Sequence, residues 1–75
     1  MAKKFTYKVL DRYAILSAKG DVTKEVRKVR FGDGPPKIDI RCWRQTENGE
    51  FMMRGVTLDQ TELRRLNEAL PIVSL

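Results

Sequence analysis

Apolar and polar residues alternate with period two through most of the first 56 residues of this 75-residue chain, and this pattern restricts the fold more than any other feature. Successive side chains of a β-strand point to opposite faces, so the alternation predicts strands with one buried and one exposed face. We expect strands over residues 5–10, 13–18, 22–31, 37–44 and 51–56. Residues 13–18 either continue the first strand past a bulge or form a second short strand.

Residues that favour turns separate these segments. Gly20 can adopt a positive φ and Asp21 can hydrogen-bond to nearby backbone, which predicts a turn over residues 19–21. Residues 32–36 read Gly-Asp-Gly-Pro-Pro, which indicates a hairpin loop rather than a phosphate cradle, because proline has no N–H to donate. The dipeptide Asn48-Gly49 predicts a hairpin closed by a type I′ turn.

One helix is expected after the strands. Either Thr57 or Asp59 can be its N-cap, and Asp59 with Glu62 resembles a capping box. The helix ends at Pro71 and carries an apolar stripe formed by Leu63, Leu66 and Leu70. Strands followed by one amphipathic helix predict an antiparallel α+β domain with the helix on one face of the sheet.

Length and composition exclude several classes of protein. A chain of 75 residues makes one small domain (residues 1–75) with a marginal core, and dimerisation is a common remedy for that. The chain has no histidine, which removes Ser-His-Asp and Cys-His catalysis and histidine-ligated metals. The single Cys42 excludes an internal disulfide and fits a reducing cytosol. No apolar run approaches the roughly 18 residues of a membrane span. We expect no enzyme, cofactor or metal.

The positive charge is concentrated in the front half of the chain. Residues 1–44 contain 12 Lys and Arg against 5 Asp and Glu, whereas residues 45–75 contain 3 against 5. The net charge of +5 therefore comes from the strands before residue 45, which become the candidate binding region for a polyanion.

Alternation assigns these cations to the faces of adjacent strands. We expect a core under Val29, Phe31, Ile38 and Ile40, with cations around an aromatic ring on the opposite face. A site for single-stranded nucleic acid requires cations that contact the phosphates and an aromatic ring that stacks on the bases. A sheet face that is simply exposed to solvent would have the same residue types. The candidate ligand-binding residues are Lys24, Lys28, Arg30, Lys37, Arg41, Trp43 and Arg54.

Other reactive or polar residues have simpler interpretations. Cys42 lies on an apolar face and is expected to be a small core residue. Glu25 and Asp39 lie among cations and are expected to pair with them rather than to perform acid–base chemistry. Trp43 either stacks on a base or packs in a core or a dimer seam.

Four segments in order carry a resemblance to a known family. These are a basic strand, Ile38-Asp39-Ile40-Arg41 with Trp43 close behind, Asn48-Gly49-Glu50, and Arg54-Gly55-Val56-Thr57-Leu58 leading into the helix. Over residues 24–70 the chain resembles the DNA-binding domain of transcriptional positive cofactor four and its small prokaryotic relatives. The resemblance implies a curved antiparallel sheet of four strands followed by one C-terminal helix, paired as a homodimer through the helix and part of the sheet. It divides the chain into an N-terminal strand region (1–23), a basic sheet (24–57) and the helix (58–70).

The same resemblance implies a function. Such domains bind single-stranded or melted DNA without catalysis and with little sequence preference, in transcription, replication or repair. Backbone contacts would fall on Lys28 and Arg30, further cationic contacts on Arg41 and Arg54, and base stacking on Phe31 and Trp43. A stand-alone prokaryotic or phage protein, cytoplasmic and associated with the nucleoid, is expected. The alternatives are binding of single-stranded RNA, or a dimeric module whose basic face binds an acidic protein.

Overall fold

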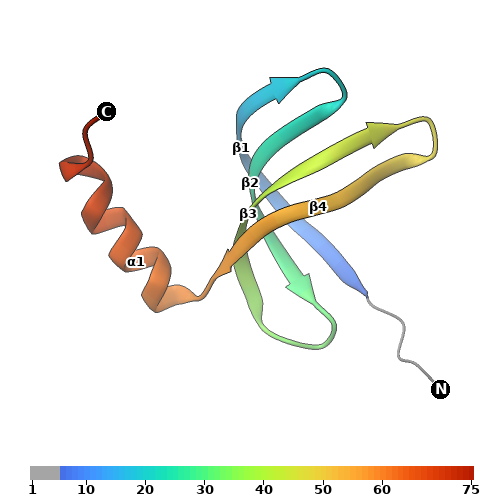
Figure 1. Cartoon of the computed structure of the whole chain (residues 1–75). Coiled ribbons are helices and arrows are strands. Elements are labelled where there is room, and N and C mark those ends of the chain that lie inside the picture. The colour runs from blue at the N-terminus through green and yellow to red at the C-terminus, as the bar shows by residue number, and fades with distance from the viewer. Residues whose placement is uncertain (1–5) are drawn as a thin grey trace.

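The computed structural model describes residues 6–75 and shows a four-stranded antiparallel sheet followed by one helix, an α+β architecture (Figure 1). The strands follow one another in the sheet in chain order, as a meander. The elements are β1 (Tyr7–Lys19), β2 (Val22–Phe31), β3 (Pro36–Thr46), β4 (Gly49–Leu58), α1 (Gln60–Ala69) and a final 3₁₀ turn, η1 (Leu70–Ile72). The predicted antiparallel sheet and C-terminal helix are confirmed; Phe5, the expected first strand residue, lies outside the described residues.

β1 resolves the alternative left open for residues 13–18. It is one continuous strand whose pairing with β2 shifts at three places, between Val9 and Asp11, between Arg12 and Ala14, and between Ile15 and Ser17. Each shift adds a residue to one strand and increases its bend and twist. Residues 13–18 therefore continue the first strand past bulges, and β1 is strongly curved.

The β3–β4 hairpin is confirmed, but its type I′ turn is wrong. Thr46 pairs with Gly49, so the two turn residues are Glu47 and Asn48. A type I′ turn needs positive φ at both positions, and no non-glycine residue among the described residues has one. Gly49 instead takes φ 116° as the first residue of β4, while the Thr46 hydroxyl donates to the Gly49 carbonyl (2.7 Å).

The pairing of β2 with β3 corrects the predicted core. Alternation within each strand is as expected, but Val29 pairs with Lys37, and Lys28 pairs with Ile38. Paired residues lie on the same face, so Val29 and Phe31 lie opposite to Ile38 and Ile40 rather than beside them. We call the face with Glu25, Arg27, Val29, Phe31, Lys37, Asp39, Arg41 and Trp43 the inner face. The outer face has Lys24, Val26, Lys28, Arg30, Ile38, Ile40 and Cys42.

The sheet is curled around the inner face. Arg12 in edge strand β1 and Glu50 in edge strand β4 approach to 3.4 Å between Nη2 and Oε1, although two strands separate them in the sheet. The side chains of Val29, Trp43, Arg27 and Asp39 are fully buried, and all four belong to the inner face. A single sheet buries residues to this extent only if it closes around them, so the inner face is the concave one.

α1 begins as predicted, and its N-cap is Asp59. The Asp59 carboxylate accepts from the Glu62 N–H (2.8 Å), and the Glu62 carboxylate accepts from the Asp59 N–H (2.9 Å), which completes a capping box. The α-helix ends at Ala69, and Pro71 lies within the 3₁₀ turn that follows it. Among residues 6–75, no helix has the length and apolar character needed to cross a membrane.

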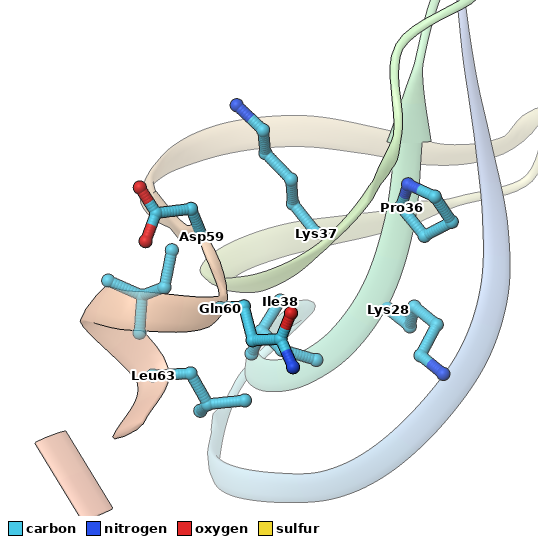
Figure 2. A pocket seen from close by; sticks show the side chains of 8 residues that line it. Lys28, Pro36, Lys37, Ile38, Asp59, Gln60 and Leu63 are labelled. Atoms are coloured by element: carbon cyan, nitrogen blue, oxygen red, sulfur yellow. The ribbon is translucent and has the colours of Figure 1, made fainter. Parts of the chain in front are cut away.

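α1 contacts the sheet mainly at its first turn and then projects away from it (Figure 1). Gln60 and Leu63 of the helix line a pocket together with Lys28, Ile38 and Leu58 of the sheet (Figure 2). Lys28 and Ile38 place this junction on the outer face. No helix residue is buried, and Leu63 and Leu70 are 37% and 56% exposed, so the apolar stripe lacks cover within the described chain.

Gly55 allows β4 to approach β3 closely. A Cβ at this position would lie 1.9 Å from the Cβ of Arg41 and 2.5 Å from the carbonyl oxygen of Ile40. No side chain fits there without moving the backbone of one strand. The glycine in the segment Arg54-Gly55-Val56 is therefore required by the pairing of the two strands.

We predict that Gly55→Ala lowers the free energy of unfolding by about 1–3 kcal/mol, the usual cost of overpacking, because β3 and β4 must separate to admit the methyl group. Urea unfolding followed by circular dichroism measures this. Gly34→Ala is the matched control, since its Cβ would meet only the Phe31 carbonyl oxygen, at 3.2 Å. An equal effect of the two substitutions would contradict the close-approach explanation.

Candidate nucleic-acid interface

The seven residues predicted from the sequence to bind a ligand do not share one face. Lys37, Arg41 and Trp43 lie on the inner face. Lys24, Lys28 and Arg30 lie on the outer face, and Arg54 lines a shallow depression there with Lys24, Ile40 and Cys42. The expectation of a single basic surface is wrong, because the register of β2 and β3 turns the two sets of cations in opposite directions.

A buried arginine that the sequence analysis did not select organises the inner face. The Arg27 side chain is fully buried, and its Nε donates to Glu25 Oε1 at 3.0 Å. Its Nη1 and Nη2 donate to the two carboxylate oxygens of Glu50, at 2.6 and 3.0 Å. Two charge-assisted contacts to one carboxylate form the bidentate geometry that suits a guanidinium. Arg27 therefore has a carboxylate partner from its own strand and another from β4.

The same guanidinium lies over an aromatic ring. Arg27 Cζ is 4.0 Å from the centroid of the Trp43 ring, within the range of a cation–π contact. The Thr23 hydroxyl donates to the second oxygen of Glu25 at 2.5 Å. Arg27 thus has a ring on one side and carboxylates around its edge, which together offset the cost of burying its charge.

These contacts shift the pKa values of both partners. Hydrogen bonds donated by Arg27 hold the pKa of Glu50 below its ordinary value near 4.5, although burial acts in the opposite direction. Burial acts to lower the pKa of Arg27, but the hydrogen bonds to Glu50 and Glu25 raise it overall. Both groups are therefore charged at neutral pH, and the pair depends on both charges.

A second inner-face arginine is also held by a carboxylate. Arg41 Nε and Nη2 donate to the two oxygens of Asp39, each at 2.7 Å, and Nη1 donates to the Met53 carbonyl at 3.0 Å. The Thr57 hydroxyl donates to Asp39 Oδ2 at 3.2 Å. The prediction that Glu25 and Asp39 pair with cations is confirmed. The same sequence pattern indicates the Glu25–Arg27 and Asp39–Arg41 pairs, because in each strand an acidic residue precedes an arginine by two positions.

Trp43 is fully buried, so the prediction of an exposed ring is wrong for this structure. Besides Arg27, its ring contacts Tyr7 at 5.7 Å between centroids, with the planes tilted by 52°. Its indole Nε1 is buried and has no hydrogen-bond partner in the part of the chain described. Trp43 acts here as the largest core side chain, which was one of the interpretations that the sequence left open.

The partly exposed rings of the inner face are Tyr7 and Phe31, which pair across β1 and β2. Arg41 Cζ lies 5.8 Å from the centroid of the Phe31 ring. In the sheet register Arg41 pairs with Glu25, and Phe31 is six residues further along β2. The curl of the sheet brings them together. Lys37 is exposed and is the diagonal neighbour of Phe31 on this face.

The outer face combines free cations with apolar residues. In the described part of the chain, the side chains of Lys24, Arg30 and Arg54 form no ion pair or hydrogen bond. Lys28 Nζ lies 6.0 Å from the Tyr13 ring. Between these cations lie Ile38, Ile40 and Cys42, all partly exposed, so Cys42 belongs to a surface that the sheet alone does not bury.

The inner face offers rings, guanidinium groups and carboxylates, but no group of three or more potential metal ligands occurs within residues 6–75. No protein-family model matches the chain, and the search of curated proteins also finds no match.

We predict that Trp43→Ala lowers the free energy of unfolding by about 3–5 kcal/mol, because it removes the largest buried side chain and the ring beneath Arg27. Thermal or urea unfolding measures the loss. Phe51→Ala is the control, since Phe51 is 57% exposed and should change the free energy of unfolding by less than about 1 kcal/mol. A mild effect of Trp43→Ala would show that the ring is not buried in solution.

Acid should weaken the fold through Glu50. Its pKa is lower in the folded state than in the unfolded chain, so its stabilising contribution is complete above about pH 4.5 and disappears as the pH falls through the folded value. We expect Glu50→Gln to be less stable than the wild type at neutral pH and to show a flatter decline below pH 4.5. Urea unfolding at a series of pH values tests this, with Glu47→Gln in the adjacent turn as the control that keeps the wild-type profile.

Proposed function

We propose that this domain binds single-stranded or melted DNA without catalysis and with little sequence preference, at the end of the inner face next to the β2–β3 loop. The observation that carries the proposal is the Phe31 ring, placed beside Tyr7 and flanked by Arg41 and Lys37 on a concave surface. A ring stacks on an unpaired base of any sequence, and cations beside it attract the phosphates.

Cations of both faces converge at this end of the sheet. Arg30 immediately precedes Phe31 on the outer face and is exposed, and Lys28 lies two residues before it. The only carboxylate of β3, Asp39, is already occupied by Arg41 and Thr57. A strand whose base stacks on Phe31 therefore passes Lys37 on one side and Arg30 on the other, with no unpaired carboxylate of β3 to repel it.

The outer face supports the second part of the proposal, a homodimer. The apolar stripe of α1 and the partly exposed Ile38, Ile40 and Val56 lie on the same side of the sheet. A two-fold pairing that lays the helix of each copy over the apolar residues of the other would cover both surfaces at once. The inner faces would then remain open to solvent. A cytoplasmic, nucleoid-associated role in transcription, replication or repair accompanies this proposal.

We predict that Phe31→Ala weakens the binding of labelled oligo-dT about fivefold to hundredfold, the cost of losing one stacked base. Arg30→Ala with Lys37→Ala should flatten the slope of log K against log salt by about 1.4, since each lost phosphate contact accounts for about 0.7. Fluorescence anisotropy over a range of salt concentrations measures both. The double variant Lys24→Ala with Arg54→Ala is the matched control. It removes the same amount of charge from the outer face, at positions further from the β2–β3 loop.

Three outcomes separate the alternatives. Equal flattening by the two double variants would contradict a site at the β2–β3 end. Tighter binding of oligo-U than of oligo-dT in competition would identify RNA as the ligand, because stacking alone does not separate the two. Failure to bind either oligomer at roughly 0.15 M salt would contradict nucleic-acid binding. It would favour the alternative in which the unpaired cations of the outer face bind an acidic protein.

A further inference from the structure

The inner face has a hollow at the end of the sheet that lies away from the β2–β3 loop. Figure 1 shows the β1–β2 and β3–β4 turns at that end. Near those turns, β1, β2 and β3 enclose about 470 Å³ between Arg12, Ile15, Glu25 and Gln45, a space that we call the β1–β2 hollow. Pockets of roughly 300–1,000 Å³ hold small molecules, so a nucleotide fits by size. Arg12 and Ile15 pair with inner-face residues of β2, which places both side chains on the inner face.

The floor of the β1–β2 hollow is polar, but its charge is already compensated. Glu25 is 5% exposed, and its two carboxylate oxygens accept from Arg27 Nε at 3.0 Å and from the Thr23 hydroxyl at 2.5 Å. A carboxylate that is paired in this way repels an approaching anion much less than a free carboxylate does. The hollow is therefore accessible to a ligand that carries a phosphate.

Three side chains around this floor have unused binding capacity. Ile15 is 65% exposed, the highest value for a large hydrophobic residue of the described strands. Arg12 is 62% exposed, and within the described chain its guanidinium donates only to Glu50, at 3.4 Å, which leaves most of its five donors free. The exposed Gln45 amide makes a weak contact with the Thr23 hydroxyl at 3.5 Å, and an amide offers both donors and an acceptor.

We propose that the β1–β2 hollow holds one nucleotide of the bound single strand, apart from the one that stacks on Phe31. The base lies against Ile15, Gln45 forms hydrogen bonds with the edge of the base, and Arg12 binds the phosphate. Because an amide both donates and accepts, it can bond to the edge of any base, which keeps the sequence preference low. This inference rests on the proposed function and adds a second contact point to it, made largely by β1 residues that precede the segment 24–70.

The two contact points lie at opposite ends of the concave face. Phe31 is six residues along β2 from Glu25, about 20 Å at the usual rise of a strand. Between them lie the buried Trp43 and the ion pair of Arg27 with Glu50, which offer neither an exposed ring nor a free cation. A strand held at both ends binds more tightly than one held at a single end, because the second contact forms within one complex. Affinity should therefore rise once an oligomer is long enough to span the face.

Ile15→Ala tests the hollow, and Leu16→Ala is its matched control. Both neighbours are aliphatic and more than half exposed, but Leu16 lies outside the hollow, at the shift in pairing between Ile15 and Ser17. By fluorescence anisotropy, we expect Ile15→Ala to weaken the binding of a labelled dT dodecamer about threefold to tenfold and Leu16→Ala to leave it unchanged. A dT trimer is too short to span both ends, so its affinity should change by no more than about twofold in either variant.

Arg12→Gln tests the phosphate contact. Lys19→Gln is its control, since it removes the same charge from an exposed residue of β1 that pairs with Val22 next to the turn. With the dodecamer, we expect Arg12→Gln to flatten the slope of log K against log salt by about 0.7, the share of one phosphate contact. Lys19→Gln should keep the wild-type slope.

The wild-type protein supplies a readout that does not depend on how well a variant folds. By NMR of isotope-labelled protein, we expect the side-chain amide signals of Gln45 to shift when the dT dodecamer is added. The side-chain amide signals of Asn67, in α1, are the internal control and should keep their positions.

Equal affinities of Ile15→Ala and Leu16→Ala for the dodecamer overturn the inference, and so do unshifted Gln45 signals in a complex that forms. In both cases the proposed function survives if Phe31→Ala still weakens binding. Equal slopes in Arg12→Gln and Lys19→Gln overturn the phosphate contact assigned to Arg12. Failure of the wild-type protein to bind the dodecamer overturns the proposed function and this inference together.

Discussion

The buried guanidinium of Arg27 is the interaction on which the curled sheet depends. A charge without solvent is strongly unfavourable unless anions and hydrogen bonds surround it, and its partners here come from β2, β3 and β4. Those partners meet only if the sheet curls, because in a flat sheet each of them would face water. The apolar core cannot supply this constraint alone, since the only fully buried hydrophobic residues among residues 6–75 are Val29 and Trp43. Polar contacts therefore shape the concave face in which a ligand would lie.

Alternation predicts the two faces of every strand, but it does not say which faces of neighbouring strands coincide. That depends on the number of residues between β2 and β3, where one residue more or fewer would turn every side chain of β3 to the other side. The loop over residues 32–35 puts Val29 opposite Lys37 and so separates the apolar residues of β2 and β3. The predicted basic surface was divided for this reason. Its residues were placed correctly on their own strands and wrongly relative to each other.

Most local signals were reliable, apart from the type I′ turn predicted from Asn48-Gly49, whereas the long-range arrangement could not be predicted. The capping box of Asp59 and Glu62 and the glycine turn at Gly20 depend on a few adjacent residues, and both are found as expected. The contact between Glu50 and Arg27 depends on an irregularity in β4, where the register shifts between Arg41 and Trp43. With regular alternation in β4, Glu50 would lie on the outer face. A bulge of this kind has no distinct sequence signature, so the ion pair between Arg27 and Glu50 could not be predicted, whereas the pairing of Glu25 with a cation could.

The outer face of the sheet is partly apolar and the inner face is polar, so the two faces favour different kinds of partner. This difference connects the proposed dimer with the proposed binding site. The outer face has partly exposed aliphatic residues beside an apolar helix stripe, and burial of such surface is favourable wherever a partner fits it. The inner face has carboxylates and guanidinium groups that already satisfy one another, and it gains little from a protein partner. A nucleic acid of the proposed kind differs, because phosphates are anions that cations attract and unpaired bases are rings that stack on other rings. In the proposed dimer, the second copy covers the apolar part of the outer face, which leaves the inner face and the exposed Arg30 at its β2–β3 end open to such a ligand.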